Sequence, residues 1–160
     1  MSPTTIRLED LPAEIGRELG PTAPIELSQK MVTEFAHLTG DFQWVHIDVD
    51  RAEREMGGTI VHGYFVLSLL PQISSSLMRL TGVDHGLNYG LERVRFPAPA
   101  RVGDNFEGRL KILEAVPRGG GVLMRNQITI NVAGLSDSSE KPVCIAENLT
   151  LVYPGTGDLA

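Results

Sequence analysis

The pattern of apolar positions divides the chain into a helical first half and a strand-rich second half. Apolar residues recur at helical spacing over 28–39. Ser28 is suited to cap the start of this helix, and Gly40 is suited to end it. The spacing therefore predicts a helix over 28–39, after an irregular segment over 1–20 and a short strand over 22–27.

A second segment, over 63–80, is apolar nearly all round, which is typical of a buried helix. Pro71 removes one backbone hydrogen bond and should bend this helix, and Gly82 should end it. Between the two helices, 41–50 has no clear period and is interpreted as a loop, while 52–56 predicts a short helical turn.

The second half carries the alternation of apolar and polar residues that is typical of strands with one buried face. A change of parity at Glu92 and Arg93 indicates a bulge. The glycine-rich segment 117–121 indicates the turn of a hairpin. The predicted strands cover 89–96, 106–112, 122–132 and 143–153.

The predicted fold class is α+β, with a long buried helix covered by an antiparallel sheet of four strands. The segment 134–141 is rich in serine and acidic residues and is interpreted as a loop. The tail after Pro154 is expected to fray.

Length and composition narrow the class of protein. A chain of 160 residues suits one domain. The net charge of −6, without a run of Lys or Arg, argues against nucleic acid as a partner. The single cysteine, Cys144, excludes an internal disulfide framework and a cysteine-cluster metal site.

No targeting segment and no membrane span is predicted. The N-terminus lacks a basic region followed by an apolar run, so it does not read as a secretory signal. The most apolar stretch, 60–70, is shorter than the roughly 18 apolar residues that a span needs. We expect no membrane partner and a cytoplasmic location.

Asp41 and His46 are the first candidates for chemistry. They lie five residues apart after the glycine that ends a helix, so a loop can bend both into one site. A carboxylate and an imidazole together can hold a water molecule and pass protons in both directions. The alternative is that Asp41 is simply a turn residue.

Gly63 begins the second helix, where unpaired N–H groups and the absence of a Cβ would let a carbonyl oxygen approach closely. This is a candidate oxyanion hole, and a simple N-cap or tight turn is the alternative. His62, which has apolar neighbours in the sequence, is interpreted as a hydrogen-bonded core histidine and not as a base. The hydroxyl of Ser68, inside a predicted helix, is expected to bond to the backbone of that helix. The four histidines lack the spacing of metal ligands, so no metal site is predicted.

Three segments together resemble the MaoC-like dehydratases, a family that includes the (R)-specific enoyl-CoA hydratases. FAHLTGDFQWVH over 35–46 resembles the hydratase signature, TIVHGYFVLSLL over 59–70 the start of the central helix, and NYGLERVRFPAPARVG over 88–103 the following strand. The branch that it resembles is the NodN-like one. The resemblance implies one hotdog domain over 1–160, with its core at about 15–153.

The resemblance also implies roles for individual residues. Asp41 and His46 match the catalytic pair, Gly63 the glycine whose N–H polarises the thioester carbonyl, and Ser68 a serine that lines the site. Trp44 stands in a motif where many members have Asn-Pro, and it either narrows the acyl pocket or packs at an interface. The implied reaction is reversible hydration of trans-2-enoyl-CoA to (R)-3-hydroxyacyl-CoA, with no metal or redox cofactor because the thioester supplies the activation.

Two other functions remain open at this stage. A hotdog acyl-CoA thioesterase would need an acid on the central helix, and 64–80 contains no Asp or Glu. A non-catalytic NodN-like acyl-binding protein would not need the Asp41–His46 pair. The sequence leaves open the acyl chain length, the carrier (coenzyme A or acyl carrier protein) and which of the pair is the base. We expect a homodimer, because a small sheet around one helix exposes a strand edge and apolar surface.

Overall fold

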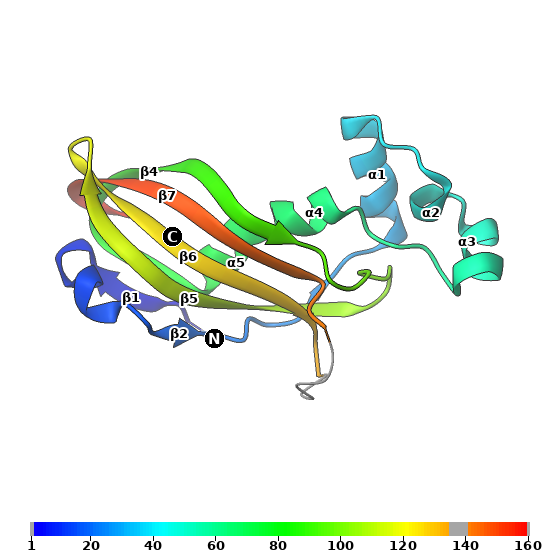
Figure 1. Cartoon of the computed structure of the whole chain (residues 1–160), viewed down its shortest axis with the longest axis horizontal. Coiled ribbons are helices and arrows are strands. Elements are labelled where there is room, and N and C mark those ends of the chain that lie inside the picture. The colour runs from blue at the N-terminus through cyan, green and yellow to red at the C-terminus, as the bar shows by residue number, and fades with distance from the viewer. Residues whose placement is uncertain (1, 135–140, 160) are drawn as a thin grey trace.

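The computed structural model describes residues 2–134 and 141–159, and it contains a seven-stranded sheet curved around a pair of short helices. The strand order is β1-β4-β7-β6-β5-β2, and β3 also pairs with β5. All pairs are antiparallel except β1 with β4. Figure 1 shows the long strands β4 to β7 lying side by side with α5 against their concave face. The expected α+β arrangement is confirmed.

The elements have the following bounds. The strands are β1 (Thr4–Arg7), β2 (Glu18–Leu19), β3 (Ile25–Glu26), β4 (Met78–Arg95), β5 (Asn105–Arg118), β6 (Gly121–Val132) and β7 (Cys144–Leu159). The helices are the 3₁₀ helix η1 (Leu8–Glu14) and the α-helices α1 (Gln29–Thr39), α2 (Trp44–Ile47), α3 (Val49–Met56), α4 (Gly63–Ser68) and α5 (Leu70–Leu77).

The first predicted helix is confirmed in its bounds and in both caps. The Ser28 side chain accepts a hydrogen bond from the Met31 N–H, and Gly40 takes the left-handed conformation with φ of 79° at the end of α1. The segment 41–50, predicted as a loop, is partly helical. It contains α2 and the start of α3, which Asp48 caps by accepting from the Arg51 N–H.

The helix predicted over 63–80 with a bend at Pro71 is present as two consecutive segments, α4 and α5, which are separated only by Leu69, two residues before Pro71. Pro71 lies in the first turn of α5, where its missing N–H costs nothing, but it cannot continue α4 because its ring would clash with the carbonyl four residues back. The helix is also not buried all round, since Tyr64 is 73% exposed.

The second helix also ends earlier than predicted. Met78 takes the extended conformation, and β4 starts there because β1 pairs with residues 78–81. Gly82 therefore does not end a helix. It lies within β4 with φ of 77°, where the pairing between β4 and β7 shifts register.

Both ends of the chain are more ordered than predicted. The segment 1–20, expected to be irregular, contains β1, η1 and β2. The tail after Pro154, expected to fray, continues β7 and pairs back onto β4 through Leu80↔Leu159 and Thr81↔Asp158. The loop predicted over 134–141 lies almost entirely outside the described residues.

The local features of the sheet agree with the prediction. The hairpin turn lies between Arg118 and Gly121, and the bulge appears where the β4–β7 register shifts after Glu92, with Arg93 at φ of 50°. The helix packs closely on β5 at Gly108, where an added Cβ would lie 2.6 Å from Ile73 Cγ2. A side chain there would push α5 off the sheet.

The helices α1, α2 and α3 lie together beyond one end of the sheet, and α4 connects them to it (Figure 1). In the part of the chain that the structure describes, no helix combines the length and the apolar character needed to cross a membrane. The junction between this helical group and the sheet is where the candidate residues meet.

Candidate active site

Asp41 follows directly on the glycine that ends α1, and its carboxylate is held by the next turn of chain. Its Oδ1 accepts from the side-chain amide of Gln43 at 3.1 Å and from the Gln43 backbone N–H at 3.4 Å. The side-chain bond from Gln43 is the main cause that lowers the pKa of Asp41 from its ordinary 3.8. Asp41 is therefore a carboxylate at neutral pH.

His46 lies on α2 with its ring buried at 7% exposure. Its Nδ1 lies 2.7 Å from the backbone carbonyl of Ile60. A carbonyl only accepts, so Nδ1 carries the proton and Nε2 is left with a free lone pair. Burial lowers the pKa of His46 from its ordinary 6.5, so the neutral form predominates at pH 7. This is the state that a general base requires.

His62 completes the cluster from the residue before α4. It is 2% exposed, and its ring stacks on the His46 ring with centroids 3.8 Å apart. Its Nε2 lies 3.0 Å from the backbone carbonyl of Asp41, so it donates there, and its buried Nδ1 has no partner among the described residues. His62 thus ties the Asp41 backbone to the His46 ring.

A side-chain relay fixes α2 against α1. The Gln29 amide donates to the carbonyl of His46 at 2.8 Å, and its oxygen accepts from the Thr59 hydroxyl at 2.5 Å. The backbone of Ile60 also bonds to Val45, with its N–H donating at 3.0 Å. The short helix that carries His46 is therefore held from both sides, which limits movement of the ring.

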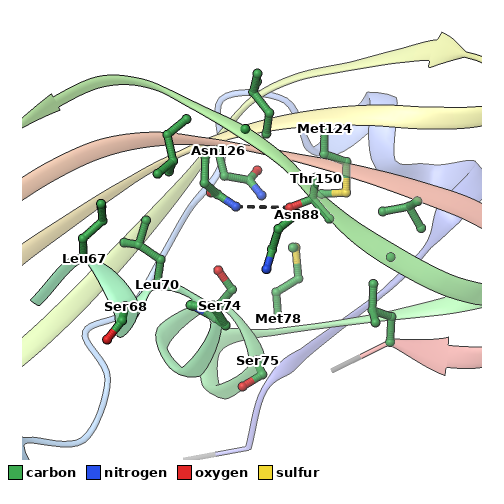
Figure 2. A pocket seen from close by; sticks show the side chains of 18 of the residues that line it. Leu67, Ser68, Leu70, Ser74, Ser75, Met78, Asn88, Met124, Asn126 and Thr150 are labelled. Carbon is green, nitrogen blue, oxygen red and sulfur yellow. Dashed lines mark hydrogen bonds between the residues drawn. The ribbon is translucent and has the colours of Figure 1, made fainter. Parts of the chain in front are cut away.

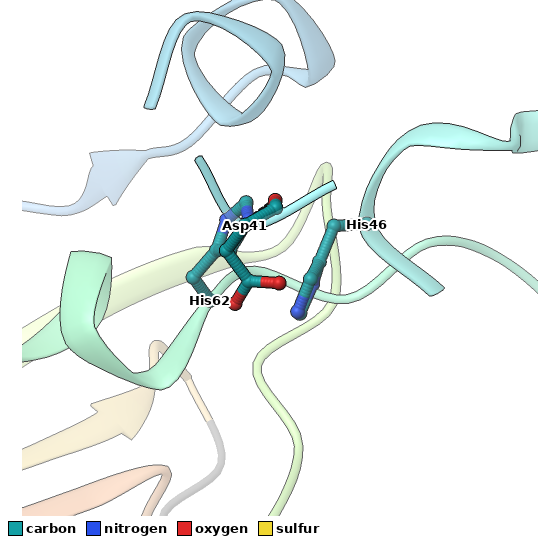
Figure 3. Close-up of side chains that lie close together, drawn as sticks. All are labelled: Asp41, His46 and His62. Carbon is teal, nitrogen blue, oxygen red and sulfur yellow. Dashed lines mark hydrogen bonds between the residues drawn. The ribbon is translucent and has the colours of Figure 1, made fainter. Parts of the chain in front are cut away.

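Figure 3 shows the Asp41 carboxylate and the rings of His46 and His62 grouped at one point. Nitrogen and carboxylate oxygen atoms from the three residues lie within 4.8 Å of one another. A neutral imidazole with a free lone pair beside an ionised carboxylate can hold one water molecule and move its proton. The expected proximity of Asp41 and His46 is present, with His46 on a helix and not on a loop.

Gly63 is the first residue of α4, directly after His62. Among the described residues no acceptor is found for its N–H, as expected for the first turn of a helix. An added Cβ would lie 3.1 Å from the Phe96 ring, so the glycine also makes room for that ring. Close packing by Phe96 and an available N–H are both consistent with a glycine here.

A cavity of about 640 Å³ lies between α4, α5 and the concave face of the sheet (Figure 2). Ser68 lines it, with its hydroxyl donating to the Phe65 carbonyl at 2.7 Å, so the predicted backbone bond is confirmed. Trp44 does not line this cavity. Its half-buried ring lies under the guanidinium of Arg51, whose Cζ is 4.0 Å from the ring centroid.

Sequence reasoning favoured a buried, hydrogen-bonded His62 and left it outside the site. The burial is confirmed, but the residue also contacts both members of the predicted pair. The available signal was its position immediately before Gly63, at the start of a helix. The spacing of the histidines along the chain gave no sign that His62 lies beside Asp41 and His46. The fold brings these residues together from separate segments of the chain.

Comparisons with known proteins agree on one family. A family model described as "MaoC like domain" matches residues 10–130. The 3-hydroxyacyl-thioester dehydratase Z of Mycobacterium tuberculosis is 36% identical over 141 residues, covering 88% of this chain and 91% of that protein. Nodulation protein N of Rhizobium leguminosarum bv. viciae is 34% identical over 151 residues, covering 92% of this chain and 91% of that protein.

Solved structures support the fold. An R-hydratase from Pseudomonas aeruginosa superposes with a TM-score of 0.68 at 20% identity, covering 92% of this chain and 86% of that one. A MaoC-like dehydratase from Rhodospirillum rubrum superposes with a TM-score of 0.70 at 20% identity, covering 94% and 98%. The expected hotdog fold is confirmed.

Proposed function

The chain belongs to the MaoC-like dehydratase family, and from that premise we propose that it catalyses the reversible hydration of a trans-2-enoyl thioester. The product is the (R)-3-hydroxyacyl thioester, with coenzyme A as the carrier. The observation that carries the proposal is the pairing of the ionised Asp41 with a neutral His46, whose Nε2 has no hydrogen-bond partner among residues 2–134 and 141–159. A relative named as a 3-hydroxyacyl-thioester dehydratase supports the same substrate class.

The proposed steps use one water molecule. His46 Nε2 takes a proton from the water while its oxygen bonds to the β-carbon of the enoyl group. The Asp41 carboxylate accepts a hydrogen bond from the second O–H of the water, which stays with the oxygen as the product hydroxyl; this bond orients the water, and the negative charge of Asp41 favours the imidazolium that forms. The imidazolium then returns the proton to the α-carbon, so the net change is the addition of one water molecule across the double bond.

Gly63 and Ser68 are proposed to bind the substrate. The free N–H of Gly63 polarises the thioester carbonyl and so makes the β-carbon electrophilic. Ser68, five residues further along α4, lines the cavity and contacts the acyl group. The (R) configuration is supported by the likeness of the fold to the R-hydratases, and chiral analysis that gives mainly the (S) product would refute it.

We assign no metal or redox cofactor to the reaction, because the thioester supplies the electronic activation. The donor atoms of Asp41, His46 and His62 are close enough to hold a metal ion, so this assignment needs a direct test. Turnover by enzyme dialysed against EDTA should match that of untreated enzyme. Loss of turnover that Zn²⁺ or Mg²⁺ restores would overturn it.

The proposed assembly is a homodimer through β4. Among the described residues, β1 covers only residues 78–81 of one edge of β4, and the rest of that edge is free. Leu87, Tyr89 and Leu91 along it are 46–50% exposed. A second copy placed antiparallel would pair this edge and cover these side chains. Light scattering that gives a stable monomer at micromolar concentration would refute the dimer.

One assay separates the proposed reaction from its two alternatives. With crotonyl-CoA, a hydratase removes the enoyl absorbance without releasing a thiol. A thioesterase releases free coenzyme A, which a thiol reagent detects. A non-catalytic acyl-binding protein binds the thioester, by calorimetry, and changes neither signal. The described helices α4 and α5 carry no Asp or Glu, which supports the hydratase over the thioesterase.

A further inference from the structure

The cavity between the central helices and the sheet has apolar walls that surround a polar patch. Its walls include Leu67, Leu70 and Met124. The patch is made by Ser74 on α5, Asn126 on β6, and Asn148 and Thr150 on β7, and Asn88 on β4 lies beside it (Figure 2). Such side chains are unusual on the face of a sheet that packs on a helix, where apolar residues are the norm.

The strand register places the patch in one spot. Asn126 pairs directly with Asn148, and Asn88 pairs directly with Thr150. Asn126 is only 2% exposed. Directly paired residues point to the same face of a sheet, so these four side chains form one surface. The amide of Asn148 donates to the Thr150 hydroxyl at 3.2 Å, which is the dashed line in Figure 2.

The patch holds hydrogen-bonding capacity that the protein does not use. In the part of the chain that the structure describes, Ser74 Oγ, Asn126 Oδ1 and Asn148 Oδ1 are buried without a partner. The neighbouring serines differ, since the hydroxyls of Ser75 and Ser76 donate to backbone carbonyls at 3.1 and 2.9 Å. Leaving a buried polar atom unpaired costs free energy, which a ligand with the matching group would recover.

We infer that this cavity binds the distal part of an acyl chain that carries a hydroxyl group, in preference to a plain alkyl chain. Amide oxygens only accept hydrogen bonds, so the matching ligand atom must donate, and a hydroxyl can also accept from Ser74. The inference rests on the proposed function, because it takes the thioester to lie at Gly63. From Gly63 to Ser74 the helical path is roughly 16 Å, so the hydroxyl would lie far from the reacting carbons.

The volume and position of the cavity fit this role. About 640 Å³ is within the usual range of small-ligand pockets, which combine apolar walls with a few placed polar groups. The cavity is lined by α4 from Tyr64 onward, directly after the residue proposed to bind the carbonyl. An acyl chain that leaves Gly63 along α4 would therefore meet apolar walls first and the patch afterwards.

The test compares matched substrates on the wild-type enzyme. Pairs of trans-2-enoyl-CoAs of equal chain length, with and without a distal hydroxyl, are assayed for kcat/KM over a range of lengths. At lengths that reach Ser74, the hydroxylated member should be favoured about 10–100-fold. A plain chain turned over equally well or better at every length would overturn the inference while leaving the hydratase proposal intact. Failure to hydrate any enoyl-CoA, crotonyl-CoA included, would refute the proposed function itself.

Variants localise the preference. Asn126→Leu should abolish the preference for the hydroxyl and raise kcat/KM for the plain chain, because an apolar side chain of similar size replaces an unpaired amide. Asn131→Leu is the matched control, since Asn131 lies on the same strand opposite Glu107 and outside the cavity lining. Thermal melting checks that each variant is folded. If Asn126→Leu does not fold, Ser74→Ala is used in its place. An unchanged preference in a folded cavity variant would overturn the inference.

Discussion

The catalytic cluster and the cavity patch differ in how many of their side chains are hydrogen-bonded to the protein, although the cluster also contains one unpaired buried atom among the described residues, His62 Nδ1. In the cluster, the rings of His46 and His62 each donate to a backbone carbonyl, and Gln43 holds Asp41. In the patch, Ser74, Asn126 and Asn148 each present a buried oxygen that has no partner in the part of the chain that the structure describes. The first arrangement fixes geometry and protonation for proton transfer, whereas the second keeps hydrogen-bonding capacity for a ligand.

The difference extends to how the two regions are built. The cluster comes from short helices and turns between α1 and α4, held by backbone bonds such as that from Ile60 to Val45. The patch comes from one helix and two strands, and more than forty residues of sequence separate the helix from the first of these strands. Substitutions should therefore damage turnover in the cluster and change selectivity or stability in the patch.

The largest expected effect is loss of turnover in the cluster. Asp41→Asn and His46→Asn should each lower kcat by at least about 10²-fold, since both groups hold the same water. The double variant should be little worse than the poorer single one, because groups that act as a unit fail together. Steady-state hydration of crotonyl-CoA measures this. Near-normal turnover in either folded variant would remove the pair from the mechanism.

The next largest effect concerns His62 as a positioning residue. His62→Phe keeps an aromatic ring against His46 but loses the bond to the Asp41 carbonyl, so kcat should fall about 10–100-fold through misplacement. The charge interaction with His62 also lowers the pKa of His46, so the acid limb of the pH profile should move to higher pH. A kcat and a pH profile like those of the wild type would show that His62 only fills space.

The pH dependence of the wild-type enzyme follows from the buried state of His46. The neutral ring is the active form and its pKa is lowered below 6.5, so kcat/KM should be level around pH 7. It should fall about tenfold per pH unit once the pH drops below that pKa. Asp41 stays ionised throughout this range, because its pKa lies below 3.8. An acid limb centred above pH 6.5 would contradict this prediction.

The same lowered pKa makes a prediction about stability. The unfolded chain takes up a proton on His46 at higher pH than the folded chain does, so the free energy of unfolding should fall as the pH drops below about 6.5. His46→Asn should lessen this slope. Denaturant titrations of both proteins on either side of that pH measure the difference, and equal slopes would contradict it.

The smallest expected effect is on the free energy of unfolding, which should change in opposite directions in a cluster variant and a patch variant. His46→Ala should lower the free energy of unfolding by about 1–3 kcal/mol, because it leaves the part-buried Ile60 carbonyl without its hydrogen bond from His46. Asn126→Leu should raise it by about 1 kcal/mol, because it removes a buried amide oxygen that has no partner among the described residues. Asn131→Leu should change it by less than about 0.5 kcal/mol. Destabilisation by Asn126→Leu would show that the patch is part of the packed core.

Local signals in the sequence were sufficient where the determinants lie close together along the chain. Ser28 and Gly40 placed α1 because capping depends on a few neighbouring backbone groups. The hairpin turn and the bulge after Glu92 were equally local. The proximity of Asp41 and His46 could be predicted because they lie only five residues apart along the chain. The resemblance of the segment to a known signature supported the same prediction.

The elements that sequence reasoning missed depend on distant partners. Met78 leaves the helix because β1, more than seventy residues earlier, offers it a strand to pair with. The tail after Pro154 is ordered because β4 supplies its hydrogen bonds. Neither segment has a strong alternation of apolar and polar residues. That each of them forms a strand is therefore seen only once its neighbouring strand is known.

The sequence by itself determined the α+β class, the first helix and the long strands, because periodicity and caps act within a few residues, and the resemblance to a known signature singled out Asp41 and His46. The tertiary structure decided that His62 joins this pair and that Asn126, Asn148 and Ser74 share one cavity. The physical reason is that burial and the lack of a hydrogen-bond partner are properties of a place in the fold, and no single segment of the chain carries them.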